Sequence, residues 1–170
     1  MSALTWLNSL PEAEARTALL RCCGATRWAE QMSARRPFAG AEDLFAAARD
    51  IAKTLSRSDW LEAFAAHPKI GDLEALRNKF APTAAWSAQE QGSLSSAAEA
   101  TLQALAAGNQ AYESKFGHIF IVCATGKSAD EMLALLEQRL GNSPAEELRI
   151  AAAEQEKITG LRLQKLLQKP

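Results

Sequence analysis

His67 is one of only two histidines in the chain, and it stands in the segment His67-Pro68-Lys69-Ile70-Gly71-Asp72. Histidine is the side chain whose ordinary pKa lies nearest neutrality, which makes it the natural candidate for proton transfer. Residues 59–66 have the apolar spacing of an amphipathic helix, and Pro68 disfavours helical dihedral angles in the residue before it. We therefore predict that His67 ends a helix at the mouth of a loop, where its ring can face a cavity. A purely structural histidine at this corner is the alternative.

Glu90 and Arg162 are two further candidates for a polar site. Glu90 follows Ser87 at the S-x-x-E spacing of a capping box, so on the sequence alone a capping role is favoured. Arg162 lies between Leu161 and Leu163 in the last helical pattern. Its planar guanidinium could bind a carboxylate or a carbonyl, whereas a solvated or ion-paired arginine on a polar face is the alternative.

Motifs for metals and nucleotides are missing from the sequence. The cysteines at positions 22, 23 and 123 are typical of reduced, buried, small hydrophobic residues. No Cys or His pair has ligand spacing and no His-Glu-x-x-His occurs, so we predict no metal site. Thr125-Gly126-Lys127-Ser128 ends like a phosphate-binding loop but lacks the earlier glycine, and we predict a turn that opens a helix there.

Composition and charge narrow the class of partner. The 170 residues are 48% hydrophobic and 23% charged, as in a globular protein, and we expect one domain over residues 1–170. The 19 Lys+Arg are dispersed among 20 Asp+Glu, which argues against a nucleic-acid partner and favours a small molecule. Apolar runs are too short for a membrane span and no signal-peptide pattern is present, so we expect no membrane association and a cytoplasmic location.

Helix signals recur along almost the whole chain and predict an all-α bundle of about seven to nine helices. Four S-x-x-E boxes predict helix starts, at Ser87, Ser96, Ser128 and Ser143, and Ser58 is predicted to cap the helix that carries His67. Further helices are expected at 11–24, around 28–32, at 41–55 and at 72–80, and the helix after Ser96 is expected to end at Gly117. Residues 118–125 have strand propensity but no partner strand, and we predict a short extended apolar link.

Four stretches, taken together and in this order, resemble the 2-oxo-4-hydroxy-4-carboxy-5-ureidoimidazoline (OHCU) decarboxylase family. Each one is weak by itself, but the set covers nearly the entire chain. They are His67-Pro68-Lys69-Ile70-Gly71, Trp86-Ser87-Ala88-Gln89-Glu90-Gln91-Gly92, Asn109-Gln110-Ala111-Tyr112-Glu113-Ser114-Lys115-Phe116-Gly117-His118-Ile119-Phe120-Ile121-Val122 and Ile158-Thr159-Gly160-Leu161-Arg162-Leu163.

The resemblance implies a helical homodimer that decarboxylates OHCU to (S)-allantoin without a cofactor, the last step from urate to allantoin in purine catabolism. By this resemblance His67 and Glu90 are the catalytic residues. It also implies a substrate pocket formed by Pro68, Ser87, Glu90, Gln91, Phe120, Ile121, Val122 and Arg162. Two alternatives stay open: a non-catalytic helical interaction module, and a cofactor-free enzyme for a different imidazolone or ureido compound.

Overall fold

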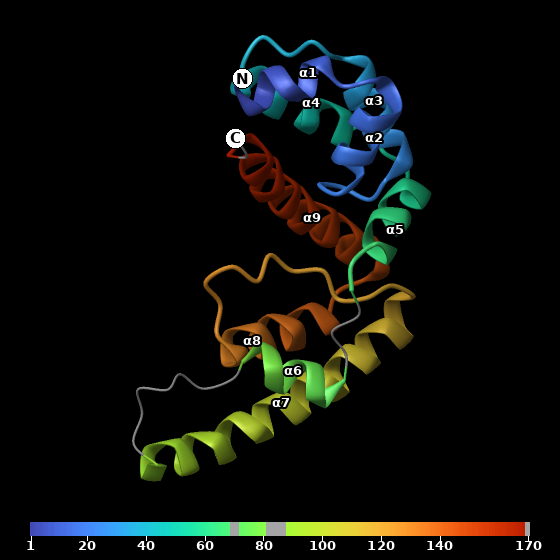
Figure 1. The fold of residues 1–170 in the computed structure, drawn as a ribbon. Coiled ribbons are helices and arrows are strands. Elements are labelled where there is room, and N and C mark those ends of the chain that lie inside the picture. The colour runs from blue at the N-terminus through green and yellow to red at the C-terminus, as the bar shows by residue number, and fades with distance from the viewer. Residues whose placement is uncertain (69–71, 81–87, 169–170) are drawn as a thin grey trace. The chain divides into compact units, whose positions relative to one another are not determined.

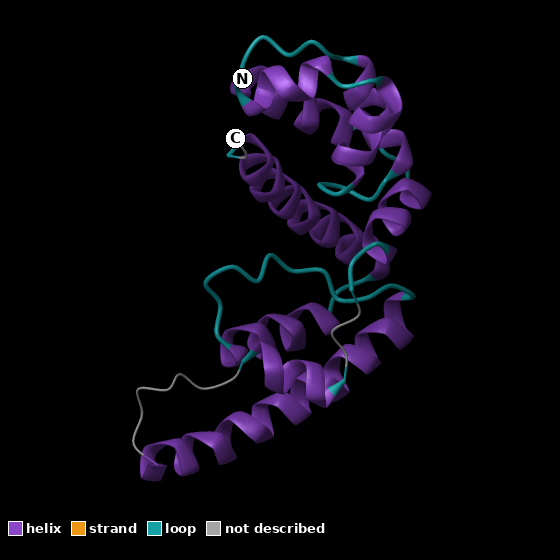
Figure 2. Cartoon of the chain, viewed as in Figure 1, coloured by secondary structure: helices purple, strands orange, loops and turns teal. Residues whose placement is uncertain are grey.

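The computed structural model describes residues 1–68, 72–80 and 88–168, and for residues 88–97 it describes the backbone only. Within this part of the chain all regular structure is α-helical, so the predicted all-α class is confirmed (Figures 1 and 2). No described helix is long and apolar enough to cross a membrane. The helices are α1 (Ala3–Ser9), α2 (Glu12–Leu20), α3 (Thr26–Ala34), α4 (Ala41–Ala52), α5 (Arg57–Ala65), α6 (Leu73–Lys79), α7 (Ala88–Phe116), α8 (Ala129–Leu140) and α9 (Pro144–Leu167).

The contacts of the chain group it into two compact units. The first contains residues 1–67, 121–123 and the chain from 148 onward, and the second contains residues 68–120 and 124–147. The first turn of helix α9 therefore belongs to the second unit, and the rest of the helix belongs to the first.

The first unit is built around one apolar core. In α4 the buried residues Leu44, Ala48 and Ile51 recur every three or four positions, which places them on one face of the helix. Trp28 of α3 is buried against this face, and its indole N–H donates to the carbonyl oxygen of Ala48 at 3.3 Å. The C-terminal part of α9 adds two leucines to the same core, at positions 163 and 166.

The second unit is organised by the long helix α7, along which α8 packs. Gly108 of α7 permits a close approach, because a Cβ placed there would lie 2.6 Å from Cδ2 of Leu136 in α8. Helix α6 is joined to α7 by an ion pair in which Nε of Arg77 lies 3.0 Å from Oε2 of Glu99.

Two of the predicted helix starts are wrong. The stretch beginning at Ser96 lies inside α7, where the alanine-rich sequence continues the helix, and its Glu99 pairs with α6 instead of a helix terminus. Helix α5 is capped by Ser56 and not by Ser58, because Ser56 forms a reciprocal box with Asp59. Helix α1, which Ser2 caps, is not among the predicted helices.

Other local predictions are confirmed. Ser128 and Ser143 accept hydrogen bonds from backbone N–H groups three residues later, at the starts of α8 and α9. Gly117 follows the last residue of α7 with a φ of 76°, the left-handed conformation that glycine adopts at a helix end.

Residues 119–124 adopt no helix or strand, as expected for an extended link. Cys22 and Cys23 are buried as predicted, whereas Cys123 is only partly buried. The box predicted at Ser87 lies outside the described residues.

Candidate active site

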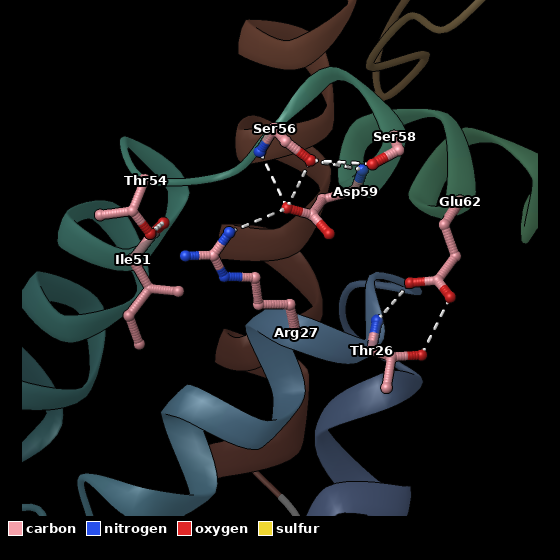
Figure 3. A network of polar contacts seen from close by, with 8 residues as sticks. All are labelled: Thr26, Arg27, Ile51, Thr54, Ser56, Ser58, Asp59 and Glu62. Atoms are coloured by element: carbon pink, nitrogen blue, oxygen red, sulfur yellow. Dashed lines mark hydrogen bonds and ion pairs between the residues drawn. The ribbon is translucent and has the colours of Figure 1, made fainter.

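Helix α5 carries the candidate histidine, and polar contacts hold this helix against α3 (Figure 3). At its start Asp59 accepts a hydrogen bond from the backbone of Ser56, and Arg27 of α3 lies 3.6 Å from the same carboxylate. One turn later Glu62 accepts from the backbone N–H and the hydroxyl of Thr26, at 2.5 and 3.0 Å. Glu62 thus satisfies a free N–H group at the first turn of α3 and ties the two helices together.

The C-terminal end of α5 packs closely against the loop before α3, and this contact positions it in space. Gly24 of this loop faces Ala66, the residue that ends α5, and a Cβ at Gly24 would lie only 2.4 Å from the Cβ of Ala66. His67 comes next, with its N–H donating to the carbonyl of Phe64 at 3.1 Å. The prediction that His67 lies at a helix end is therefore confirmed.

The ring of His67 is half-buried and contacts a side chain far away in the sequence. Its Nε2 lies 2.5 Å from Oε1 of Gln155, which is fully buried in α9. The amide nitrogen of Gln155 donates to Oγ1 of Thr159 at 3.2 Å. The histidine is thus anchored to α9 by a chain of hydrogen bonds.

Burial lowers the pKa of His67 below its ordinary value of 6.5 because it disfavours the charged ring. The hydrogen bond to Gln155 opposes this shift, and the positive charge of Arg162 adds to it. The ring is therefore mainly neutral at pH 7, which is the state that can accept a proton.

Arg162 lies on the same face of α9 as Gln155 and Thr159, since the three are spaced four and three residues apart. It is half-buried, and one guanidinium nitrogen donates to the carbonyl oxygen of Arg21 at 3.3 Å. Its positive charge contributes to the lowered pKa of His67. Arg162 thus shares one face of α9 with Gln155, the residue that contacts His67.

The predicted segment 120–122 is divided between the two units. Ile121 is buried and Val122 is half-buried in the first unit, and the next residue, Cys123, donates its backbone N–H to Glu154 of α9 at 3.2 Å. Glu154 directly precedes Gln155, so this segment and His67 contact neighbouring residues of α9.

Phe120 belongs to the second unit, where it rests on a buried polar cluster. The cluster consists of Tyr112 in α7, Arg139 in α8 and Glu147 in α9. The ring of Phe120 lies 5.3 Å from that of Tyr112 and 4.5 Å from the guanidinium of Arg139. The fully buried carboxylate of Glu147 accepts from the Tyr112 hydroxyl at 2.5 Å and from Nε of Arg139 at 2.6 Å. Burial, together with Glu147, raises the pKa of Tyr112, so its phenol remains a hydrogen-bond donor.

The other predicted site residues lie in the second unit or outside the described residues. Pro68 is exposed and belongs to the second unit. Glu90 and Gln91 lie in the first turn of α7, and their side chains are outside the description. Ser87 is outside it altogether, so the roles of these residues stay predictions.

A cavity of about 320 Å³ lies in the first unit. Its walls are mainly apolar side chains of α3, α4, α5 and α9, with Trp28, Phe45 and Trp60 the largest. Thr159 reaches its wall, but none of the predicted site residues that the structure describes lines it. Thr159 therefore belongs both to the wall of this cavity and to the chain of hydrogen bonds that anchors His67.

Gln155 and Thr159 are the polar contacts that the sequence analysis missed. The available signal was the polar row at 155, 159 and 162, which helical spacing places on one face. A solvent-exposed polar face has the same sequence pattern as a polar face that contacts another segment. Only the packing of α9 in the structure distinguishes these two cases.

Comparisons with known proteins agree with the motifs. Residues 8–164 match the family model described as OHCU decarboxylase. The chain is 42% identical over 148 residues to the uric acid degradation bifunctional protein TTL of Arabidopsis thaliana, covering 85% of this chain and 45% of that protein, so it spans less than half the length of this relative. It is 32% identical over 140 residues to the OHCU decarboxylase of Amia calva, covering 79% and 77% of the two chains.

Two solved structures resemble the fold. A crystal structure of OHCU decarboxylase in the presence of (S)-allantoin matches with a TM-score of 0.71 and 41% identity, over 88% of this chain and 96% of that one. A crystal structure of (S)-allantoin synthase matches with a TM-score of 0.68 over 96% of this chain and 54% of that one, and at 22% identity it supports the fold alone. The family predicted from the four stretches is thereby confirmed: the chain belongs to the OHCU decarboxylase family.

Proposed function

We propose that this chain decarboxylates OHCU to (S)-allantoin, the last step from urate to allantoin. The observation that carries the proposal is the half-buried His67, hydrogen-bonded to Gln155 on the face of α9 that also carries Arg162, in a chain of the OHCU decarboxylase family. The names of its relatives and the (S)-allantoin in the crystals of a 41% identical protein support the substrate and the product.

The reaction suits a protein without a cofactor, because the substrate absorbs its own electrons. When the bond to the carboxylate breaks and carbon dioxide leaves, the electron pair passes into the adjacent C=N and carbonyl groups of the ring. The hydroxyl gives up its proton and becomes a carbonyl, and a proton adds to one face of the neighbouring carbon that bears the ureido group, which gives one enantiomer of allantoin. The protein needs to orient the carboxylate, stabilise the developing negative charge and control the proton.

In this proposal His67 is the acid and base that acts on the substrate hydroxyl and governs protonation of the carbanion. Arg162 binds the carboxylate or a carbonyl through its planar fork of N–H groups. Glu90 and Gln91 bind ring N–H, hydroxyl or ureido groups. Pro68, Ser87, Phe120, Ile121 and Val122 complete the pocket.

We further propose that residues 1–170 act as one functional domain, that the chain forms a homodimer, and that it works in the cytoplasm on a small molecule. The dispersed surface charge supports a small-molecule substrate rather than a nucleic acid. Sedimentation of the pure protein at several concentrations measures the oligomeric state directly, and a monomer at all of them would refute the dimer.

The test of the function uses freshly generated urate-oxidation product. The pure protein should increase the rate at which circular dichroism of optically active allantoin develops. His67→Ala should fold normally and lose about 10²–10⁴-fold in turnover, the usual contribution of a general acid–base group. Arg57→Ala, an exposed position on the same helix, is the matched control and should match the unmodified protein.

Failure takes two distinct forms. Racemic allantoin at the uncatalysed rate, from a folded protein, would remove the decarboxylase and favour an interaction module or another substrate. Near-normal turnover in a well-folded His67→Ala protein would keep the function and remove His67 as its acid and base.

A further inference from the structure

The contact between His67 and α9 involves a side chain with two chemically different ends. Gln155 is fully buried and Thr159 is 6% exposed, so the polar atoms of both require partners within the protein. One end of the amide lies 2.5 Å from Nε2 of His67, and the other lies 3.2 Å from the hydroxyl of Thr159. An amide oxygen only accepts hydrogen bonds and an amide nitrogen only donates them. Which end faces the ring therefore decides which ring nitrogen carries the proton.

Thr159 favours one of the two orientations. Its hydroxyl oxygen accepts a hydrogen bond from the amide nitrogen of Gln155 at 3.2 Å. A lone pair of this oxygen thus receives the amide N–H, and the nitrogen end of the amide faces Thr159. The amide oxygen then faces His67 and accepts the proton on Nε2. In the neutral ring the other nitrogen, Nδ1, then carries the lone pair.

We infer that Gln155 is a positioning residue that holds His67 in the tautomer protonated at Nε2, with Thr159 fixing the amide, so that Nδ1 is the nitrogen that accepts the substrate's proton. This inference rests on the proposed function for its consequence in catalysis. The tautomer and orientation of the His67 ring do not depend on the proposed function.

The absence of a charge on Gln155 also affects the pKa of His67. A carboxylate at this position would stabilise the charged imidazolium and so raise the pKa of His67. The amide orients the ring as a carboxylate would, but without this stabilisation. The ring thus stays a neutral base at pH 7, while Arg162 adds a nearby positive charge that disfavours its protonation.

The tautomer can be measured without activity, because the chain has only two histidines. Two-bond ¹H–¹⁵N spectra of the imidazole rings distinguish the tautomers, and the signals lost in His67→Asn identify its ring. In the unmodified protein His67 should be protonated at Nε2 alone. Thr159→Val removes the acceptor at nearly constant shape and should give a mixture of tautomers, whereas Thr159→Ser keeps the hydroxyl and should keep the pattern.

Kinetics supply the second readout. Thr159→Val should lower kcat by at least about tenfold, as expected when a residue that orients an imidazole is lost, with KM little changed. Thr159→Ser should restore kcat. Gln155→Glu should move the titration of His67 and the acid limb of the kcat profile to higher pH.

The outcomes separate this inference from the proposed function. If folded Thr159→Val and Gln155→Glu leave both the tautomer and the titration of His67 unchanged, the inference is overturned even where decarboxylation is found. If the unmodified protein lacks decarboxylase activity while Thr159→Val and Thr159→Ser differ in tautomer, the function fails and the positioning of the ring stands. Should Thr159→Val fail to fold, the spectrum of the unmodified protein decides: a proton on Nδ1 of His67 overturns the inference, and a proton on Nε2 alone supports it.

Discussion

Replacing Gly24 by alanine tests whether tertiary contact positions the end of α5. The added Cβ would lie 2.4 Å from the Cβ of Ala66, while carbon atoms in contact prefer about 3.5–4.0 Å, so one backbone segment has to move by about 1 Å. Neither Cβ can rotate away. Overpacking of this kind costs about 1–3 kcal/mol, which lowers Tm by about 2–12 °C in a chain of this length.

The same displacement reaches the candidate site, because Ala66 directly precedes His67. A shift of about 1 Å weakens the contact between the ring and Gln155, and misplacement on this scale lowers turnover by up to about 100-fold. We therefore expect Gly24→Ala to lose both stability and kcat, measured by calorimetry and by the circular-dichroism assay.

Two further variants make this test specific. Gly160→Ala, within α9 where nothing lies within 4 Å of the new Cβ, should raise stability by up to about 1 kcal/mol through helix propensity. Adding Ala66→Gly to Gly24→Ala removes the clash and should recover most of the lost Tm and kcat. Unchanged Tm and turnover in Gly24→Ala, or no recovery in the double variant, would refute the close approach as the cause.

The remaining predictions concern single side chains. Tyr112→Phe removes a donor to the buried carboxylate of Glu147 and should cost about 1–3 kcal/mol in urea unfolding; no loss would show that the remaining donors suffice. Glu90→Gln should leave Tm nearly unchanged and sharply reduce single-turnover rate if Glu90 binds substrate, whereas a lowered Tm with normal chemistry would assign it to capping. Arg162→Lys keeps the charge but loses the planar fork, so binding of allantoin measured by calorimetry should weaken together with turnover; unchanged affinity would place Arg162 outside the pocket. Because the pKa of His67 is lowered in the folded protein, the unfolded chain binds a proton at this residue more readily than the folded chain does. The contribution of His67 to the free energy of unfolding is therefore fully present above about pH 6.5 and is lost as the pH falls through the folded pKa. His67→Asn should remove this component when unfolding free energies are compared between pH 5 and 8, and a parallel pH dependence would contradict it.

Sequence determined the helical class and most helix boundaries, because these depend on neighbours within a few residues. The caps at Ser128 and Ser143 and the glycine end at Gly117 each follow from backbone groups less than one turn away. The helix end at His67 has the same origin, since Pro68 restricts the residue before it. The family was also recognisable at this level, because its four stretches keep their order along the chain.

Local signals failed where two of them competed. Ser56 and Ser58 both suit a helix start, and the reciprocal box of Ser56 with Asp59, reinforced by Arg27 of α3, decided between them. At Ser96 a capping pattern lost to continuous helix, and Glu99 found its partner in α6.

The environment of the candidate base was decided by tertiary structure alone. Gln155 is 88 residues from His67 along the chain, and nothing in the local pattern of either residue predicts that they meet. The buried cluster of Tyr112, Arg139 and Glu147 joins three helices in the same way. Capping and helix propensity act over one turn of backbone, whereas the pKa of a ring and the partner of a buried amide depend on desolvation and contacts that exist only after distant segments have packed.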